Sequence, residues 1–155
     1  MNRTLAKALG CGIILFLCLC SGTRPSNLGV HDGKLAPCPE SPNCVSTFAS
    51  DKTHSIAPLS YIGTAIDAKQ KLIKVINSLP RTRIVADKGS YIDAEFTSFL
   101  WRFVDDVEFL FNDSAKTIQF RSASRLGYGD MGVNRKRMET IKENFEKSEK
   151  AYGGR

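Results

Sequence analysis

Cysteine, histidine and serine are the residues of this chain whose chemistry suits nucleophilic catalysis or metal binding. One hypothesis makes Cys44 a nucleophile with His54 as its base, and another makes Cys38, Cys44 and His54 ligands of a metal. A zinc site normally has a fourth ligand, and a catalytic base needs a group that orients it. The sequence shows neither, so we expect no catalytic residue, no metal and no cofactor.

A hydrolase that uses Ser122 or Ser124 is a further hypothesis of the same kind. The chain has two histidines, His31 and His54, and neither is near these serines in sequence. A serine nucleophile needs an adjacent base. An enzyme, whether thiol-dependent through Cys44 and His54 or hydrolytic through Ser122 and Ser124, therefore remains the alternative to a protein without catalytic activity.

The first residues have the pattern of a secretory signal. Arg3 and Lys7 precede an uninterrupted run of small and apolar residues, Ala8 to Leu19, as the charged start and apolar middle of a signal peptide do. The run is shorter than the roughly 20 residues that cross the apolar core of a bilayer. We therefore expect residues 1–19 to be a removable signal peptide and not a permanent membrane span.

The cleavage site decides the form of the mature protein. Residues 17–20 (LCLC) resemble the lipobox of bacterial lipoproteins, so we expect a cut before Cys20 and a lipid on its thiol. Leu19 stands where the lipobox normally has a small residue, and ordinary cleavage after Gly22 is the alternative. In either case we expect an exported protein of the cell envelope, periplasmic or membrane-anchored, with a flexible tether at residues 20–34, a single domain at 35–150 and a disordered tail at 151–155.

The charge of the chain is mildly basic. The formal net charge is +6, and removal of residues 1–19, which hold two basic and no acidic residues, leaves +4. A charge of this size suits an anionic membrane surface or a small acidic ligand and is weak support for nucleic-acid binding. Export also argues against a nucleic-acid partner.

Two of the five cysteines remain for the domain, because Cys11 and Cys18 lie in the expected signal peptide and Cys20 is the expected lipid site. Two cysteines in an oxidising compartment favour one disulfide. The residues between Cys38 and Cys44 are turn-forming, so the two α-carbons can approach each other. We expect a Cys38–Cys44 disulfide.

Hydrophobic periodicity predicts two helices and four strands. Apolar residues recur at helical spacing from Ala65 to Leu79, after a capping-box pattern that starts at Thr64 and before Pro80, and again over residues 132–149. Alternating apolar residues predict strands over residues 84–86, 92–96, 107–111 and 118–122. The short links between them favour an antiparallel arrangement. We expect an α+β domain with a four-stranded antiparallel meander and two helices packed on one face.

The opposite face of this sheet carries charged residues. Alternation places Asp93 and Glu95, Asp106 and Glu108, and Gln119 and Arg121 away from the apolar side. One interpretation is cross-strand ion pairing on a solvated face, and the other is a polar binding surface.

Two blocks of sequence resemble an uncharacterised family. Residues 38–46 (CPESPNCVS), residues 120–137 (FRSASRLGYGDMGVNRKR) and, between them, residues 105–109 (DDVEF) are similar to the domain of unknown function 1499, found in bacteria and plastid-bearing organisms. The resemblance covers residues 35–145 and implies no established activity.

The second block has residues suited to binding an anion. Its arginines accompany glycines at a strand-to-helix turn, where free backbone N–H groups and the positive end of a helix dipole attract negative charge. The structural alternative is that Asp130 caps the helix, Asn134 satisfies nearby backbone groups and Arg121 pairs with Asp106 or Asp105, with strand parity favouring Asp106. The candidate ligand-binding residues are Asp105, Asp106, Arg121, Ser122, Ser124, Arg125, Asp130, Asn134, Arg135 and Arg137.

The sequence therefore favours an exported, lipid-anchored envelope protein without catalytic activity. Its expected partners are the membrane, through the lipid on Cys20, and a small anionic ligand or another envelope protein.

Overall fold

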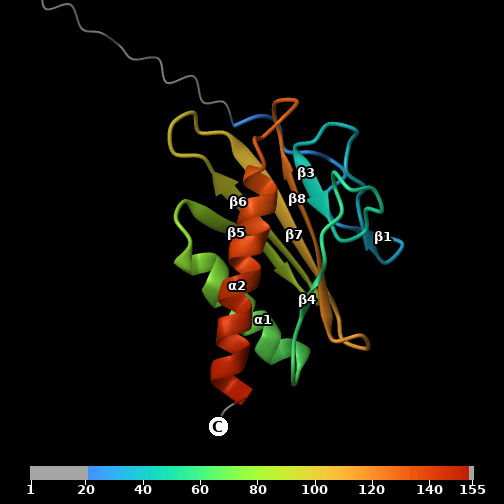
Figure 1. The fold of residues 1–155 in the computed structure, drawn as a ribbon, viewed down its shortest axis with the longest axis vertical. Coiled ribbons are helices and arrows are strands. Elements are labelled where there is room, and N and C mark those ends of the chain that lie inside the picture. Colours follow the sequence, from blue (N-terminus) through green and yellow to red (C-terminus); the bar gives the residue numbers. More distant parts are fainter. Residues whose placement is uncertain (1–20, 154–155) are drawn as a thin grey trace, which may run out of the picture.

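The computed structural model describes residues 21–153, which form an α+β fold of two helices and one main antiparallel sheet (Figure 1). The expected signal peptide, residues 1–19, and the expected lipid site at Cys20 lie outside the described residues. The elements in chain order are β1 (Val30–His31), β2 (Lys34–Leu35), β3 (Cys44–Ser46), β4 (Leu59–Ser60), α1 (Ala65–Ser78), β5 (Thr82–Lys88), β6 (Tyr91–Thr97), β7 (Val104–Asn112), β8 (Thr117–Ser124) and α2 (Val133–Gly153).

The main sheet has six strands, so the expected four-stranded meander is wrong. Strands β5, β6, β7 and β8 pair antiparallel in consecutive order, and β8 pairs on its other edge with both β3 and β4. The two strands of this sheet that sequence analysis missed, β3 and β4, have three and two residues. A segment of that length is too short to show the alternation that identifies a strand. The α+β class is unchanged.

Helix α1 begins and ends where its sequence indicates. The Thr64 hydroxyl accepts a hydrogen bond from the Asp67 N–H at 3.1 Å, which confirms the cap. The helix ends at Ser78, two positions before Pro80, which has no N–H to continue it. Helix α2 extends past the expected end at residue 149 to Gly153, into the region expected as a tail.

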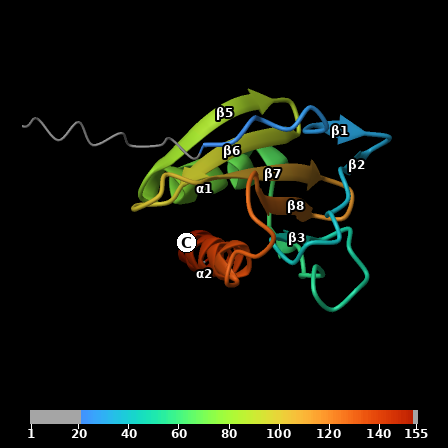
Figure 2. The same ribbon diagram turned by 90° about the horizontal axis from the view of Figure 1, so that it is seen from above.

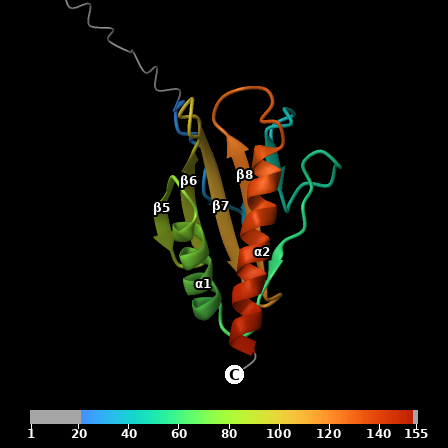
Figure 3. The same ribbon diagram turned by 60° about the vertical axis from the view of Figure 1, so that its left-hand side comes forward.

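Both helices pack on the same face of the sheet, as Figure 3 shows. The core between them consists of fully buried aliphatic and aromatic side chains, each worth about 1.5–3 kcal/mol when removed from water. It includes Leu72 and Ile76 of α1, Met138, Ile141 and Phe145 of α2, and Phe109 and Phe120 of the sheet. No helix of the described part of the chain is long and apolar enough to cross a membrane.

The N-terminal segment from Ser21 to β2 contacts the other face of the sheet. Strands β1 and β2 form a small antiparallel pair, and Figure 2 shows them on the side of the sheet away from α2. Along this segment, which we expected to be a flexible tether, the Gly29 N–H donates to Glu108 of β7 and Arg24 forms ion pairs with β6. The segment therefore covers charged side chains of the sheet.

Candidate functional site

The face of the sheet beneath the N-terminal segment holds four carboxylates and their arginine partners. Asp93 and Glu95 come from β6 and Asp106 and Glu108 from β7, and all four point to this face because they alternate with core residues. Three of them, all except Glu95, are at least 98% buried. We call them, with Arg24, Arg83, Arg121, Arg125 and Tyr91, the outer cluster.

Arg125 is the best-connected cation of the outer cluster. It donates from Nε to Asp106 Oδ2 at 2.8 Å and from Nη2 to Asp106 Oδ1 at 2.6 Å, and it also donates to Glu95. These hydrogen bonds raise the pKa of Arg125 above its ordinary value despite its burial. A two-pronged arginine–carboxylate pair of this kind fixes geometry as well as charge. Arg125 therefore ties the end of β8 to β7 and β6.

We expected Arg121 to pair with Asp106, but in the structure it pairs with Glu108. The register of β7 and β8 places Glu108 directly opposite Arg121 and Asp106 opposite Ala123. The Arg121 Nη1 to Glu108 Oε2 distance is 3.5 Å, with both side chains buried. Strand parity predicted the correct face for Arg121. Parity does not give the register, however, so the predicted partner was two residues away from the observed one.

The N-terminal segment, which covers this face of the sheet, supplies further partners for the carboxylates of the outer cluster. Arg24 pairs with Asp93 and lies 3.3 Å from Glu95, and the Gly29 N–H and Tyr91 hydroxyl donate to Glu108 at 2.7 and 2.8 Å. Burial nevertheless raises the pKa of Asp93 and of Glu108 above their ordinary values. Burial also opposes ionisation of Glu95, but hydrogen bonds from Arg83 and Arg125 outweigh it and lower the pKa of Glu95.

One row of the outer cluster is incompletely satisfied. Asp93, Glu108 and Arg121 are neighbours across β6, β7 and β8. Among the described residues, Asp93 Oδ1 and Arg121 Nε are buried without a hydrogen-bond partner. A buried polar atom without a partner costs about 1–3 kcal/mol. This row is therefore the weaker part of the cluster, and the Arg125 pair the stronger.

A second polar group lies on the helix face of the sheet and centres on Asn134. The Ser122 hydroxyl donates to Asn134 Oδ1 at 2.5 Å, and Asn134 Nδ2 donates to Asn43 O and to Ser124 Oγ. Asp130 accepts from the Asn134 N–H at 2.7 Å at the start of α2. These contacts join the start of α2 to β8 and to Asn43, the residue before β3, so they hold the helix against this edge of the sheet.

Arg137 contributes a positive charge to this second polar group on the helix face. It donates to Asn134 Oδ1 at 2.7 Å and to Asp105 Oδ2 at 2.5 Å, and its guanidinium lies 4.9 Å from the ring centroid of Phe96. Asp105 and Asp106 therefore serve opposite faces of the sheet, although they are adjacent in sequence. Arg135 lies elsewhere and donates to the carbonyls of Thr53 and Ser55.

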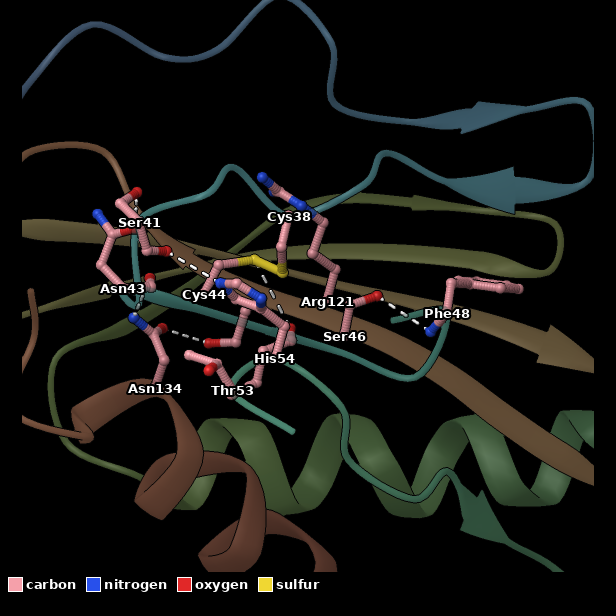
Figure 4. The surroundings of a disulfide bond; sticks show 12 residues. Cys38, Ser41, Asn43, Cys44, Ser46, Phe48, Thr53, His54, Arg121 and Asn134 are labelled. Atoms are coloured by element: carbon pink, nitrogen blue, oxygen red, sulfur yellow. Dashed lines mark hydrogen bonds between the residues drawn. A yellow bond between two sulfur atoms is a disulfide. The ribbon is translucent and has the colours of Figure 1, made fainter. Parts of the chain in front are cut away.

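The residues of the thiol-enzyme and metal-site hypotheses, Cys38, Cys44 and His54, lie close together, as Figure 4 shows. Cys38 and Cys44 form the expected disulfide, with their α-carbons 5.7 Å apart. Cys44 therefore has no free thiol. The two ring nitrogens of His54 lie 2.9 Å from an Asp51 carboxylate oxygen and 3.2 Å from the Ser41 carbonyl. His54 thus connects two turns of the loop beside the disulfide.

The sequence-predicted candidates therefore do not form one site. Asp106, Arg121 and Arg125 lie on the outer face, whereas Asp105, Ser122, Ser124 and Asn134 lie on the helix face or at its edge. Within residues 21–153 no group of three or more histidine, cysteine, aspartate or glutamate side chains is placed to hold a metal ion. Most of the candidate arginines are occupied by partners of the protein itself.

A cleft at the end of the sheet, which sequence analysis missed, has room for a ligand. Its volume is about 310 Å³, and its walls are mostly apolar. Three chain segments that are distant in sequence build it, which is why no local motif marks it. We call it the end cleft; it is lined by Leu79, Pro80 and Arg81 after α1, Phe96, Thr97 and Ser98 at the end of β6, and Val133, Lys136, Arg137 and Thr140 of α2.

Cations surround the end cleft. Lys136 is exposed, and its ammonium group makes no hydrogen bond or ion pair with the described residues. Arg81 is exposed, donates from Nε to the Thr97 carbonyl at 3.1 Å and makes no ion pair with the described residues. Arg137 stands at the inner wall. The end cleft therefore combines apolar walls with positive charge at its rim.

These features define a disulfide-closed α+β domain, with helices on one face of an antiparallel sheet and a buried ion-pair cluster on the other. The sequence profile of the family described as Protein of unknown function (DUF1499) matches residues 34–145, and the chain belongs to this family. The match confirms the resemblance found in the sequence. Searches of curated proteins and of solved structures found no significant match.

Proposed function

We propose that this protein is an exported, lipid-anchored protein of the cell envelope that binds an amphiphilic anion in the end cleft and does not catalyse a reaction. The amphiphile has an apolar chain and a carboxylate or phosphate head, as a fatty acid or a lysophospholipid does. The charged start, the apolar run and Cys20 support export and anchoring. The Cys38–Cys44 disulfide suits an oxidising compartment.

The composition of the end cleft is the observation that carries the proposal. Leu79, Pro80 and Val133 offer apolar surface, and Lys136 and Arg81 offer positive charge at the rim. Ligand pockets are typically apolar, with a few polar groups that fix orientation. An apolar chain lying along the walls places its anionic head beside Lys136. The net positive charge of the chain favours the same class of ligand.

The enzyme alternative has less support because its residues have other partners. Cys44 is bonded to Cys38. The Ser122 hydroxyl donates to Asn134, and the Ser124 hydroxyl accepts from it, so neither is paired with a base. The remaining anion-binding candidate of the sequence, the arginine-rich turn, is similarly occupied by Asp106, Glu95 and Asp105.

Calorimetric titration tests whether the end cleft binds an amphiphilic anion. The chain starting at Ser21, checked for cooperative unfolding, is titrated with dodecanoate and with lysophosphatidylglycerol below their micelle concentrations. Lys136→Glu should weaken binding about tenfold or more, which corresponds to about 1.4 kcal/mol. Lys88→Glu is the matched control, since Lys88 is also exposed, lies at the end of β5 and is not part of the cleft. Equal affinity of both variants would remove the end cleft from consideration.

A further inference from the structure

The same end of the molecule exposes an unusual amount of apolar surface on two loops. The β6–β7 loop carries Phe99, Leu100 and Trp101, which are 77%, 66% and 64% exposed. The β8–α2 loop carries Leu126, Tyr128 and Met131, of which Met131 is fully exposed. We call these six residues the aromatic end. Large apolar side chains that gather on a surface mark an interaction site.

The described chain begins beside the aromatic end. Gly22 packs so closely on the β8–α2 loop that an added Cβ would lie 2.9 Å from Arg125 Cβ and from Leu126 Cγ. Figures 1 and 3 both show the blue start of the described chain at the end of the sheet where the β6–β7 and β8–α2 loops lie. The apolar run up to Leu19 and the cysteine at position 20 directly precede this point. A membrane anchor at Cys20 therefore attaches within a few residues of the aromatic end.

Positive charge surrounds the exposed apolar side chains. Arg102 lies in the β6–β7 loop itself, and the Arg81 guanidinium is 5.5 Å from the ring centroid of Phe99. Asp130 is an acidic residue of the β8–α2 loop, and its carboxylate accepts hydrogen bonds from the Gly132 and Asn134 N–H groups at the start of α2. Tryptophan and tyrosine favour the interface between lipid and water, and basic residues beside them are attracted to anionic lipid headgroups.

We propose that the aromatic end is a membrane-docking surface, which inserts its apolar side chains into the interface of the bilayer that holds the N-terminal anchor. This inference rests on the membrane location proposed above and adds an orientation. The six-stranded sheet then stands with its β6–β7 end toward the lipid, and the end cleft, whose lining residue Arg81 lies over the Phe99 ring of this surface, opens close to the headgroups. An amphiphilic anion can enter the cleft from the membrane.

Trp101 is the natural probe because it is the single tryptophan of the chain. The mature protein, purified after its host has removed the signal peptide, is reconstituted into vesicles of phosphatidylcholine and phosphatidylglycerol, with or without bromine atoms in the upper acyl chains. Brominated lipid should remove about half of the Trp101 emission, since an interfacial tryptophan lies at the depth of the headgroups and upper chains. The emission should also move to shorter wavelength.

A relocated tryptophan is the matched control. The double variant Trp101→Phe with Ile62→Trp carries its tryptophan on a side chain that is 76% exposed. The Ile62 N–H donates to Glu149 near the C-terminal end of α2, so this position lies at the opposite end of the domain. Its emission should be unaffected by brominated lipid. A second variant, Phe99→Ser with Leu100→Ser, keeps Trp101 and should lose most of the quenching.

The outcomes separate the docking surface from the proposed function. Chains that float with the vesicles but show no quenching of Trp101, or equal quenching at both positions, overturn the docking surface and leave the anchor intact. Chains that do not float overturn both. A shift of the Trp101 emission that depends on protein concentration and needs no lipid identifies a second copy as the occupant and also overturns the proposal.

Discussion

Replacement of Arg125 by alanine tests whether the outer cluster stabilises the fold. The Arg125 side chain is 7% exposed and Asp106, its two-pronged partner, is 1% exposed, so Arg125→Ala leaves a buried carboxylate without its main partner. Breaking a buried pair costs about 3–5 kcal/mol. Arg24 remains 3.6 Å from Asp106 and can compensate in part. We therefore expect a loss near the lower limit, about 3 kcal/mol.

Arg83→Ala is the control, because Arg83 pairs with Glu95 of the same cluster but its side chain is 70% exposed. Its removal should cost less than about 1 kcal/mol. The free energy of unfolding is measured by urea titration with the disulfide intact, and equal slopes are required for the comparison. In a double-mutant cycle, Arg125 should couple with Asp106 by about 1–3 kcal/mol. An Arg125→Ala loss no larger than that of Arg83→Ala would refute a buried, stabilising cluster.

Three further predictions concern pH, the disulfide and the N-terminus. Burial raises the pKa of Glu108 above its value in the unfolded chain, so the protonated group favours the folded state at low pH and this contribution is lost as the pH rises through the folded pKa. Glu108→Gln, which cannot ionise, should therefore gain stability relative to the wild type as the pH rises above about 4, the ordinary pKa of a glutamate, and a difference independent of pH in urea titrations would contradict this. Thiol labelling of the native protein should find neither Cys38 nor Cys44, and their reduction should lower the unfolding free energy by about 2 kcal/mol, whereas labelling of both without reductant would disprove the bond. Mass spectrometry of the mature protein should find a lipid on Cys20, and an unmodified chain beginning at Ser21 or Thr23 would exclude the anchor.

The long strands and α1 could be predicted because their side chains alternate or recur over several residues. β6, for example, has Ile92, Ala94 and Phe96 toward the core and charged residues between them. The short strands β3 and β4 leave no such pattern, and pairing to β8 defines them only in three dimensions. The disulfide was predictable because the Cys38–Cys44 loop is short and its turn is local.

The partners within the candidate site could not be predicted, because register is a property of the whole sheet. Arg121 lies on the outer face opposite Glu108, and a register shift of two residues would place it opposite Asp106 without changing the face. The polar composition of residues 20–34 suggested a tether, since the sequence does not reveal that the Gly29 N–H reaches Glu108. The end cleft depends on three segments that only the fold brings together.

Nuclear magnetic resonance of the domain with dodecanoate tests the central claim, binding of an amphiphilic anion in the end cleft, most directly. The account predicts saturable shifts of the Thr97, Ser98, Val133 and Thr140 amide signals, all from the lining of the end cleft. The amides of Ser148 and Ala151, which line a separate hollow between α1 and α2, should not move. Shifts confined to that hollow, or no saturable shifts at the end cleft, would contradict the account.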